Sequence, residues 1–291
     1  HMVHMPGHIW LILGDWEMAA SVNERAVQVD QNYFSATHVM GGSYMPYYIH
    51  NLHFVLYARS MQGRKRDALE AASRLLSEME PVVDAMPEWA DSFLPVPMLA
   101  YVRFGDWDSL LKMPQPKPGM KTSTTVWHFG RAMALSAKGD KPGAARERDA
   151  FEKMRAQVAV EAPWGQNKAS VLLHLASEVI SARLADSPAE AIPHWQRAVQ
   201  MQDTLVYDEP PAWYYPLRES LGAEQLRAGR PADAEQTFRE GVKRSPRNGR
   251  MLFGLLQSLQ AQRKQEDAAW VKREFEANWA KADISLSLAA L

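Results

Sequence analysis

The sequence predicts an all-α protein in which about seven degenerate helical hairpins stack as one right-handed solenoid. Three observations support this fold class. A short turn signature recurs along the chain, small residues flank each turn at regular offsets, and no stretch alternates apolar and polar residues as a half-buried strand would. We expect roughly 13 to 15 helices in a single domain, residues 1–291, with an elongated and curved shape.

The hairpin signature is clearest in residues 220–248. Gly222 comes seven residues before Gly229, and Ala234 follows that glycine by five. A glycine such as Gly229 can adopt the left-handed conformation that ends a helix, and Pro231 suits the first turn of the next one. The small residues at 222 and 234 let the two helices approach closely. These residues therefore predict two helices joined by a tight turn.

Equivalent turns recur from the beginning of the chain to its end. Arg263 stands where the last turn would have glycine, and the turn near residue 186 has none. Pro114 and Pro116 shorten the helix after Gly105, because proline cannot continue a helix. Most spacings exceed the ideal repeat of about 34 residues, which predicts longer helices or loops that border a binding face. The predicted turns lie at residues 14, 63, 105, 139, 186, 229 and 263.

Composition and charge exclude several functions. Thirty-three basic residues against 34 acidic ones leave a formal net charge of −1, which gives no footprint for nucleic acid. The absence of cysteine excludes disulfides, thiolate metal sites and cysteine nucleophiles. No apolar run approaches the roughly 18 residues of a membrane span. We therefore expect a soluble protein, and the composition leaves cytoplasm and periplasm open.

Motifs spread over nearly the whole chain resemble a group of bacterial tetratricopeptide-repeat proteins. They are HMPGHI at 4–9, YYIHNLHF at 47–54 and YDEPPAWYYPLRE at 207–219. The tetratricopeptide repeat is a helix–turn–helix unit of about 34 residues. The resemblance implies that fold but no settled activity, and Ile49 departs from it where the group often has proline. Because members continue upstream with another histidine-containing segment, it also implies that this chain is the C-terminal part of a longer protein.

Six of the nine histidines lie in a histidine-rich segment, residues 1–54. His4 and His8 are four residues apart, a spacing that places both on one face of a helix. His50 and His53, three apart, repeat this arrangement on the first helix of the next hairpin. First helices of neighbouring hairpins pack side by side in such solenoids. The two pairs are therefore expected to converge on one site. The alternative interpretation is that each of these histidines is a separate half-buried or capping residue.

Two further histidines are weaker candidates for this site. His1 lies three residues before His4, but Pro6 kinks or begins the helix between the histidines because it removes a backbone donor. His128 lies on a later helix, with Trp127 beside it, and would add a ligand from further along the groove. Both are ranked below the two spaced pairs.

Imidazole ligands without thiolate suit a divalent transition metal such as zinc, copper, nickel or iron. Four nearby methionines favour copper slightly, although methionine is more often a core filler. We therefore expect copper or zinc as cofactor, with binding that weakens as the pH falls through about 6.5, because a protonated imidazole cannot ligate. The methionines are Met2, Met5, Met40 and Met45.

Other side chains are expected to support the site. Tyr48 and Asn51, next to the second histidine pair, are suited to orient an imidazole through its other ring nitrogen. In the segment 207–219, Glu209 is a candidate ligand or general base, and Tyr214 a hydrogen-bond donor beside Trp213. The alternative is that this segment is only a joint between hairpins, packed by its aromatic side chains.

Two functions of different classes remain open from the sequence. The first is a repeat protein with a histidine-based metal or ligand site on the concave face of its first repeats, whether or not it is an enzyme. The second is a scaffold whose concave groove binds a protein, a peptide or a small ligand and holds no metal. The spacing of the histidines favours the first, and the repeat architecture alone favours the second.

Overall fold

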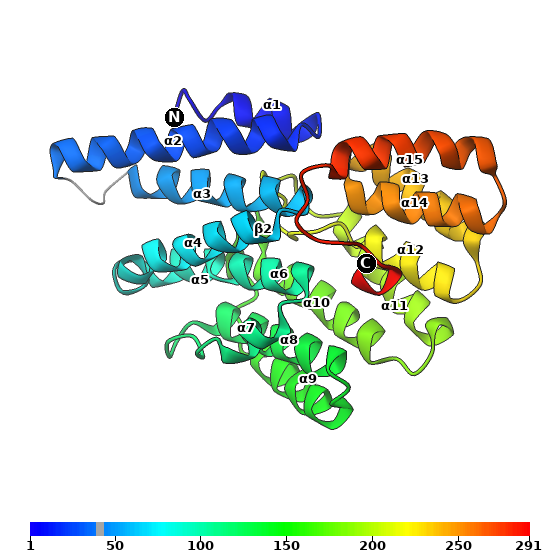
Figure 1. The fold of residues 1–291 in the computed structure, drawn as a ribbon. Coiled ribbons are helices and arrows are strands. Elements are labelled where there is room, and N and C mark those ends of the chain that lie inside the picture. Colours follow the sequence, from blue (N-terminus) through cyan, green and yellow to red (C-terminus); the bar gives the residue numbers. More distant parts are fainter. Residues whose placement is uncertain (39–43) are drawn as a thin grey trace.

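The computed structural model describes residues 1–38 and 44–291, and these residues form the predicted all-α protein (Figure 1). They contain fifteen α-helices, within the expected number. The helices are α1 (Pro6–Ile12), α2 (Trp16–Thr37), α3 (Tyr44–Met61), α4 (Lys65–Ala85), α5 (Pro87–Phe93), α6 (Pro95–Phe104), α7 (Trp107–Lys112), α8 (Lys121–Ala137), α9 (Lys141–Arg155), α10 (Ala169–Leu184), α11 (Pro188–Asp203), α12 (Arg218–Arg227), α13 (Pro231–Arg244), α14 (Gly249–Ala261) and α15 (Gln265–Trp279).

Two small elements were not predicted. A two-residue antiparallel hairpin joins β1 (Pro163–Trp164) to β2 (Asn167–Lys168), and Gly165 allows its turn with a φ of +57°. A short 3-10 helix, η1 (Leu288–Ala290), follows α15 near the end of the chain. The described residues contain no helix that is long and apolar enough to cross a membrane.

A left-handed residue ends the first helix at six of the seven predicted turns. Arg263 adopts this conformation with a φ of +60°, although it carries a side chain. The turn near residue 186 differs, because Ala185 is extended and Ser187 caps α11 by accepting a hydrogen bond from the Glu190 amide. The left-handed residues are Gly14, Gly63, Gly105, Gly139, Gly229 and Arg263.

Consecutive helices pack against each other along most of the chain, for example α2 on α3, α8 on α9 and α10 on α11. The C-terminal helices show why small residues are needed at the crossings. Phe238 on α13 is fully buried between Gly222 on α12 and Gly254 on α14. A β-carbon at Gly222 would lie 2.5 Å from the Phe238 ring. The prediction that Gly222 lies where two helices cross is therefore confirmed.

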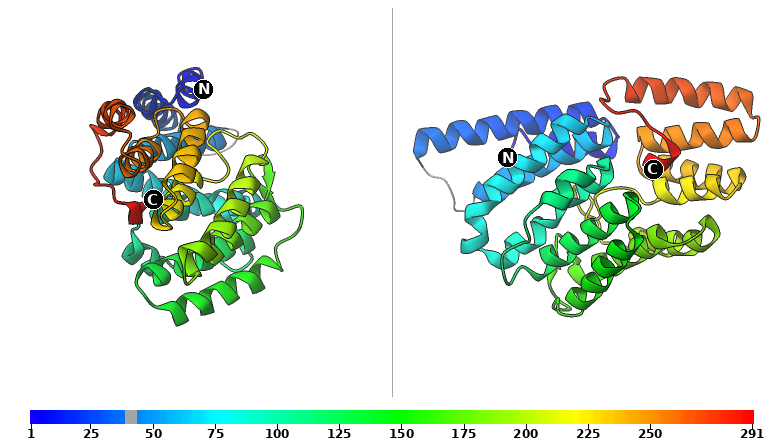
Figure 2. Two further views of the ribbon diagram at one scale, coloured as in Figure 1. Left: turned by 90° about the vertical axis from the view of Figure 1, so that its right-hand side faces the viewer. Right: turned by 60° about the horizontal axis from the view of Figure 1, so that its bottom comes forward.

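The helices at the start of the chain also contact the segments near its end. The expected elongated shape does not predict these contacts. The Trp16 indole donates a hydrogen bond to the carbonyl of Arg247 at 3.3 Å. The carboxylate of Asp283 accepts hydrogen bonds from the amides of Lys65 and Arg66. The C-terminal segment leaves α15 and runs back beside the N-terminal helices, as Figure 1 and the two views of Figure 2 show. Residues from the two ends of the chain thus lie side by side.

Candidate metal centre

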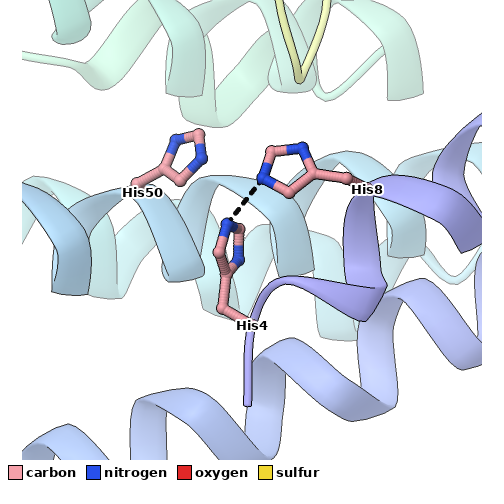
Figure 3. A group of neighbouring side chains, drawn as sticks. All are labelled: His4, His8 and His50. Carbon is pink, nitrogen blue, oxygen red and sulfur yellow. Dashed lines mark hydrogen bonds between the residues drawn. The ribbon is translucent and has the colours of Figure 1, made fainter. Parts of the chain in front are cut away.

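Three histidines from two separate segments meet beside the first helices (Figure 3). His4 precedes α1, His8 lies on α1, and His50 lies on α3. Each offers one ring nitrogen, and these three atoms all lie within 4.8 Å of one another. The closest pair is the two Nε2 atoms of His4 and His8, which are 2.8 Å apart. The three residues are therefore placed so that they could hold a metal ion, and we call them the histidine triad.

His4 and His8 do not lie on one continuous helix as the sequence spacing suggested. Residues 2–5 form a turn, and α1 begins only at Pro6. The proline lacks the amide that a helix extending upstream would use. The turn nevertheless keeps His4 next to His8. His1 lies outside the triad, with its ring centroid 5.0 Å from that of Tyr47.

An apolar side chain supports the triad from α3. The buried Phe54 ring has its centroid 4.9 Å from that of His4, 4.8 Å from that of His8 and 5.0 Å from that of His50. All three contacts are edge-on. This ring fixes one side of every imidazole without offering it a hydrogen-bond partner, so the ring nitrogens must find partners elsewhere.

The Nδ1 atoms of His4 and His8 face hydrogen-bond acceptors. His4 Nδ1 lies 2.7 Å from Oδ1 of Asn23, a fully buried residue of α2. The Asn23 amide nitrogen donates to the carbonyl of Ala19 at 2.8 Å, which fixes the orientation of the amide. His8 Nδ1 bonds to a carboxylate oxygen of Glu209. The second Glu209 oxygen accepts a hydrogen bond from the hydroxyl of Tyr207.

These partners determine where the ring protons lie. Because Asn23 Oδ1 and the Glu209 carboxylate both accept, His4 and His8 each carry a proton on Nδ1. In the neutral rings both Nε2 atoms then present lone pairs, and those atoms are 2.8 Å apart. Two lone pairs at this distance repel unless a cation lies between them. The cation is either an added proton or a metal ion.

Burial opposes the added proton. It lowers the pKa of His4, an effect that the hydrogen bond donated to Asn23 partly offsets and a charge on His8 would enhance. The pKa of His50 falls to about 3, first because of burial and then because of repulsion from His4 and His8. His4 and His50 therefore resist protonation below the ordinary histidine pKa of about 6.5. As far as these two ligands decide it, the expected weakening of metal binding moves to lower pH.

His53 lies one turn beyond His50 but outside the triad. Its ring stacks on that of Tyr214 with centroids 5.3 Å apart, and the Tyr214 hydroxyl donates to the backbone carbonyl of His53. Its Nε2 is buried and has no hydrogen-bond partner. His50 and His53 line a small cavity of about 50 Å³ together with Glu209.

The other predicted site residues face different partners. Tyr48 bonds to Glu78 and Asn51 to Asp30, so neither orients a histidine of the triad. His128 on α8 pairs with Glu147, and the Trp127 indole donates to the carbonyl of Met113. Trp213 is buried against Phe129 in the largest core cluster. Among the methionines, Met45 is buried with Phe34 and Tyr48, and Met40 lies outside the described residues.

Two residues of the site were not anticipated from the sequence. Phe54 gives no signal beyond an aromatic residue in an apolar helix. Asn23 does give one, because it lies on the small-residue face of its helix, between Ala19 and Ala26, where a buried polar group needs a partner.

No protein-family model matches the chain, and no curated protein matches it.

Proposed function

We propose that the protein binds a divalent transition metal ion through His4, His8 and His50. One observation carries this proposal: two Nε2 atoms lie 2.8 Å apart while both rings are held with their Nδ1 atoms protonated. A metal ion relieves the repulsion without the cost of charging a buried imidazole. Ligand nitrogens at about 2.0–2.1 Å from an ion lie roughly 3.3 Å apart in a tetrahedron, so small ring rotations would suffice.

The surroundings of the triad support a metal ion that is ready for exchange or reaction. Asn23 and Glu209 hold the outer nitrogens of two ligands, the usual second contact of metal-bound histidines. Three protein ligands leave a fourth position for water or substrate, as in catalytic zinc sites. Three nitrogens without thiolate suit zinc or copper. Glu209, which bonds to His8 and has Tyr207 on its other oxygen, is a candidate for proton transfer beside the triad.

We also propose the repeat architecture and the family relationship that the sequence predicts. We infer that the helices are about seven degenerate tetratricopeptide-like units in one right-handed solenoid, of the bacterial group that carries the HMPxH, YYxHNxHF and YDEPPAWYYPLRE motifs. Six left-handed turn residues and the close crossing at Gly222 support this inference. In this arrangement α1 and α3 are first helices of neighbouring repeats, and the triad lies between them.

The test is metal content together with titration. Tag-free protein is analysed for bound elements and then titrated with Zn²⁺ and Cu²⁺ by calorimetry after chelation. We expect one ion per chain, with binding abolished in His8→Ala and in His50→Ala. His174→Ala, which changes an exposed histidine on α10, is the matched control and should bind as the parent does. Equal affinity of the parent and the His50→Ala variant would show that the triad is not the site.

A metal-independent scaffold is the second candidate function. A cavity of about 320 Å³ lies between α1, α3 and the segment 205–218, and its walls include Trp16, Tyr57 and Trp213. An aromatic cavity of this kind suits an apolar peptide side chain or a small ligand. Retention of a partner by metal-free protein and by the His50→Ala variant would favour this function.

A further inference from the structure

The cavity beside the segment 205–218 has a lining that indicates which kind of ligand it suits. Its volume of about 320 Å³ is within the range typical of small-molecule sites. Two of its lining side chains, Ile12 on α1 and Val206, are apolar and expose 57% and 59% of their surface. The buried rings of Trp16 and Tyr57 line the cavity as well. Part of the wall is therefore apolar surface that an organic ligand would cover and so remove from water.

The lining also includes the carboxylate of Asp208, which the backbone holds in place. Its Oδ2 accepts a hydrogen bond from the amide of Gln166 at 2.9 Å, and its Oδ1 accepts one from the amide of Glu209 at 3.1 Å. Gln166 lies in the turn between β1 and β2. The side chain of Asn167 exchanges two further hydrogen bonds with the backbone of Val206, at 2.8 and 3.0 Å. The small hairpin thus fixes this segment and sets the orientation of the carboxylate.

No basic side chain balances the charge of this carboxylate. Among the residues that the structure describes, no lysine or arginine forms an ion pair with Asp208 or with Glu209, which also lines the cavity. Glu209 bonds instead to His8 of the triad and to the Tyr207 hydroxyl. Burial, together with the adjacent charge of Glu209, raises the pKa of Asp208, although its two amide partners oppose the shift. The amides stabilise the carboxylate without neutralising it, and a cation in the cavity would do so.

The two arginines in the lining are already paired with other acidic groups. Arg218 donates two hydrogen bonds of 2.6 Å to the carboxylate of Asp203. Arg244 pairs with the same carboxylate at 3.3 Å and with that of Glu240 at 2.9 Å. These four groups carry two positive and two negative charges, which balance one another. The unbalanced charge of the lining is therefore negative, and it lies on Asp208 and the neighbouring glutamate.

One buried polar group of the wall also lacks a partner. Tyr57 exposes only 4% of its surface, and its hydroxyl forms no hydrogen bond within the part of the chain that the structure describes. This hydroxyl is not sealed off, unlike the indole nitrogen of Trp213, which belongs to the same lining. A buried hydroxyl without a partner is unfavourable. The cavity therefore offers a polar ligand one free hydroxyl in addition to the carboxylate.

We propose that this cavity binds a small organic amine in its protonated form. The ammonium group pairs with the Asp208 carboxylate, because hydrogen bonds between ionised groups are the strong ones. The apolar body of the amine lies against Ile12 and Val206. An anion of the same size would be repelled by Asp208 and Glu209. The proposal rests on the scaffold function suggested for the same cavity, names the ligand for it, and requires no metal ion at the histidine triad.

Phenethylamine is the probe, and phenethyl alcohol, which has nearly the same shape without the charge, is its matched control. Both are titrated by calorimetry into the intact, metal-free chain at about pH 7, where an alkylamine is protonated like lysine. We expect saturable binding of the amine, at least about tenfold tighter than that of the alcohol, because the alcohol cannot form the charge-assisted pair. Equal binding of the two probes overturns the amine proposal but keeps the cavity as a ligand site. Binding of neither probe overturns the amine proposal and also counts against the scaffold function.

Variants then locate the site. Asp208→Asn removes the charge and keeps the shape, so it should weaken phenethylamine binding at least about tenfold and leave any binding of the alcohol unchanged. Asp149→Asn, the same change at an exposed carboxylate of α9 outside the cavity, should bind both probes as the parent does. Unchanged amine binding in a folded Asp208→Asn variant would place the ligand elsewhere and overturn the proposal. The comparison of the two probes on the parent chain needs no variant, so it decides the proposal even if Asp208→Asn does not fold.

Discussion

At the scale of single residues, the orientation of the histidine triad depends on hydrogen bonds made on the far side of each ring. The amide of Asn23 cannot flip without losing its bond to Ala19, so it offers only an oxygen to His4. Glu209 offers only oxygens to His8. Two ligands therefore present Nε2 before any ion arrives, and this preorganisation lowers the entropy cost of binding.

Asn23→Ala tests that preorganisation. Without the amide, the His4 ring loses its fixed tautomer and orientation, so we expect metal affinity to fall about 10–100-fold, the usual effect of removing such a partner. Calorimetric titration with Zn²⁺ measures the change, and circular dichroism verifies that the helices remain. Gln28→Ala, on the exposed face of the same helix, is the control and should bind normally. An Asn23→Ala variant with parental affinity would show that the ring needs no such support.

His53→Leu tests the acid sensitivity of the buried histidines. Burial lowers the pKa of His53 to about 3, whereas the unfolded chain keeps a value near 6.5. Below about pH 6.5 the unfolded state therefore binds more protons, and stability falls with pH by up to about 1.4 kcal/mol per unit.

Leucine cannot take up a proton, so metal-free His53→Leu should lose up to about 2 kcal/mol less than the parent between pH 7 and pH 5. Urea unfolding at the two pH values measures this difference. His174→Gln, at an exposed position, should follow the parent. Parallel losses in the parent and the leucine variant would mean that His53 titrates normally in the folded protein.

At the scale of elements, turns were predicted well because their cause is local. A left-handed residue is required where one helix ends and the next begins, and glycine at 14, 63, 105, 139 and 229 reports that requirement directly. The sequence also allowed α1 to begin at Pro6, because the effect of a proline on a helix is local too. The prediction that His4 and His8 lie on one continuous helix was wrong, because residues 2–5 form a turn. The turn nevertheless places the two histidines close together.

Gly222→Leu tests the crossing of α12 and α13. The new side chain would meet the Phe238 ring, which is fully buried and also packed against Gly254, so it has no room to move. Overpacking of this kind typically costs about 1–3 kcal/mol, and we expect a value at the upper end. Urea unfolding measures it. Ala277→Leu on the exposed face of α15 is the control, and equal stability of the two variants would contradict the assigned crossing.

At the scale of the whole molecule, the contacts between the two ends of the chain escaped prediction. Turn signatures specify which helices pack as neighbours in sequence, but not how helices far apart in the chain lie relative to one another. The contact between Trp16 and Arg247 joins residues 231 positions apart, and no local pattern marks either partner. The meeting of Glu209 with His8 has the same origin, since 201 residues separate them. Glu209 could be named as a candidate site residue from its motif, but its contact with His8 could not be predicted.

Asp283→Ala tests how much these long-range contacts contribute. The helix α4 lacks a capping side chain of its own at Arg64, and Asp283 supplies one from 218 residues beyond Lys65. Loss of a capping carboxylate costs about 0.5–2 kcal/mol, so the variant should unfold at lower urea concentration. The amides of Lys65 and Arg66 should also exchange with solvent faster. Ser287→Ala, an exposed change in the same segment, should alter neither measurement. If Asp283→Ala keeps both the stability and the amide protection of the parent, the C-terminal segment does not hold the first helices against the last.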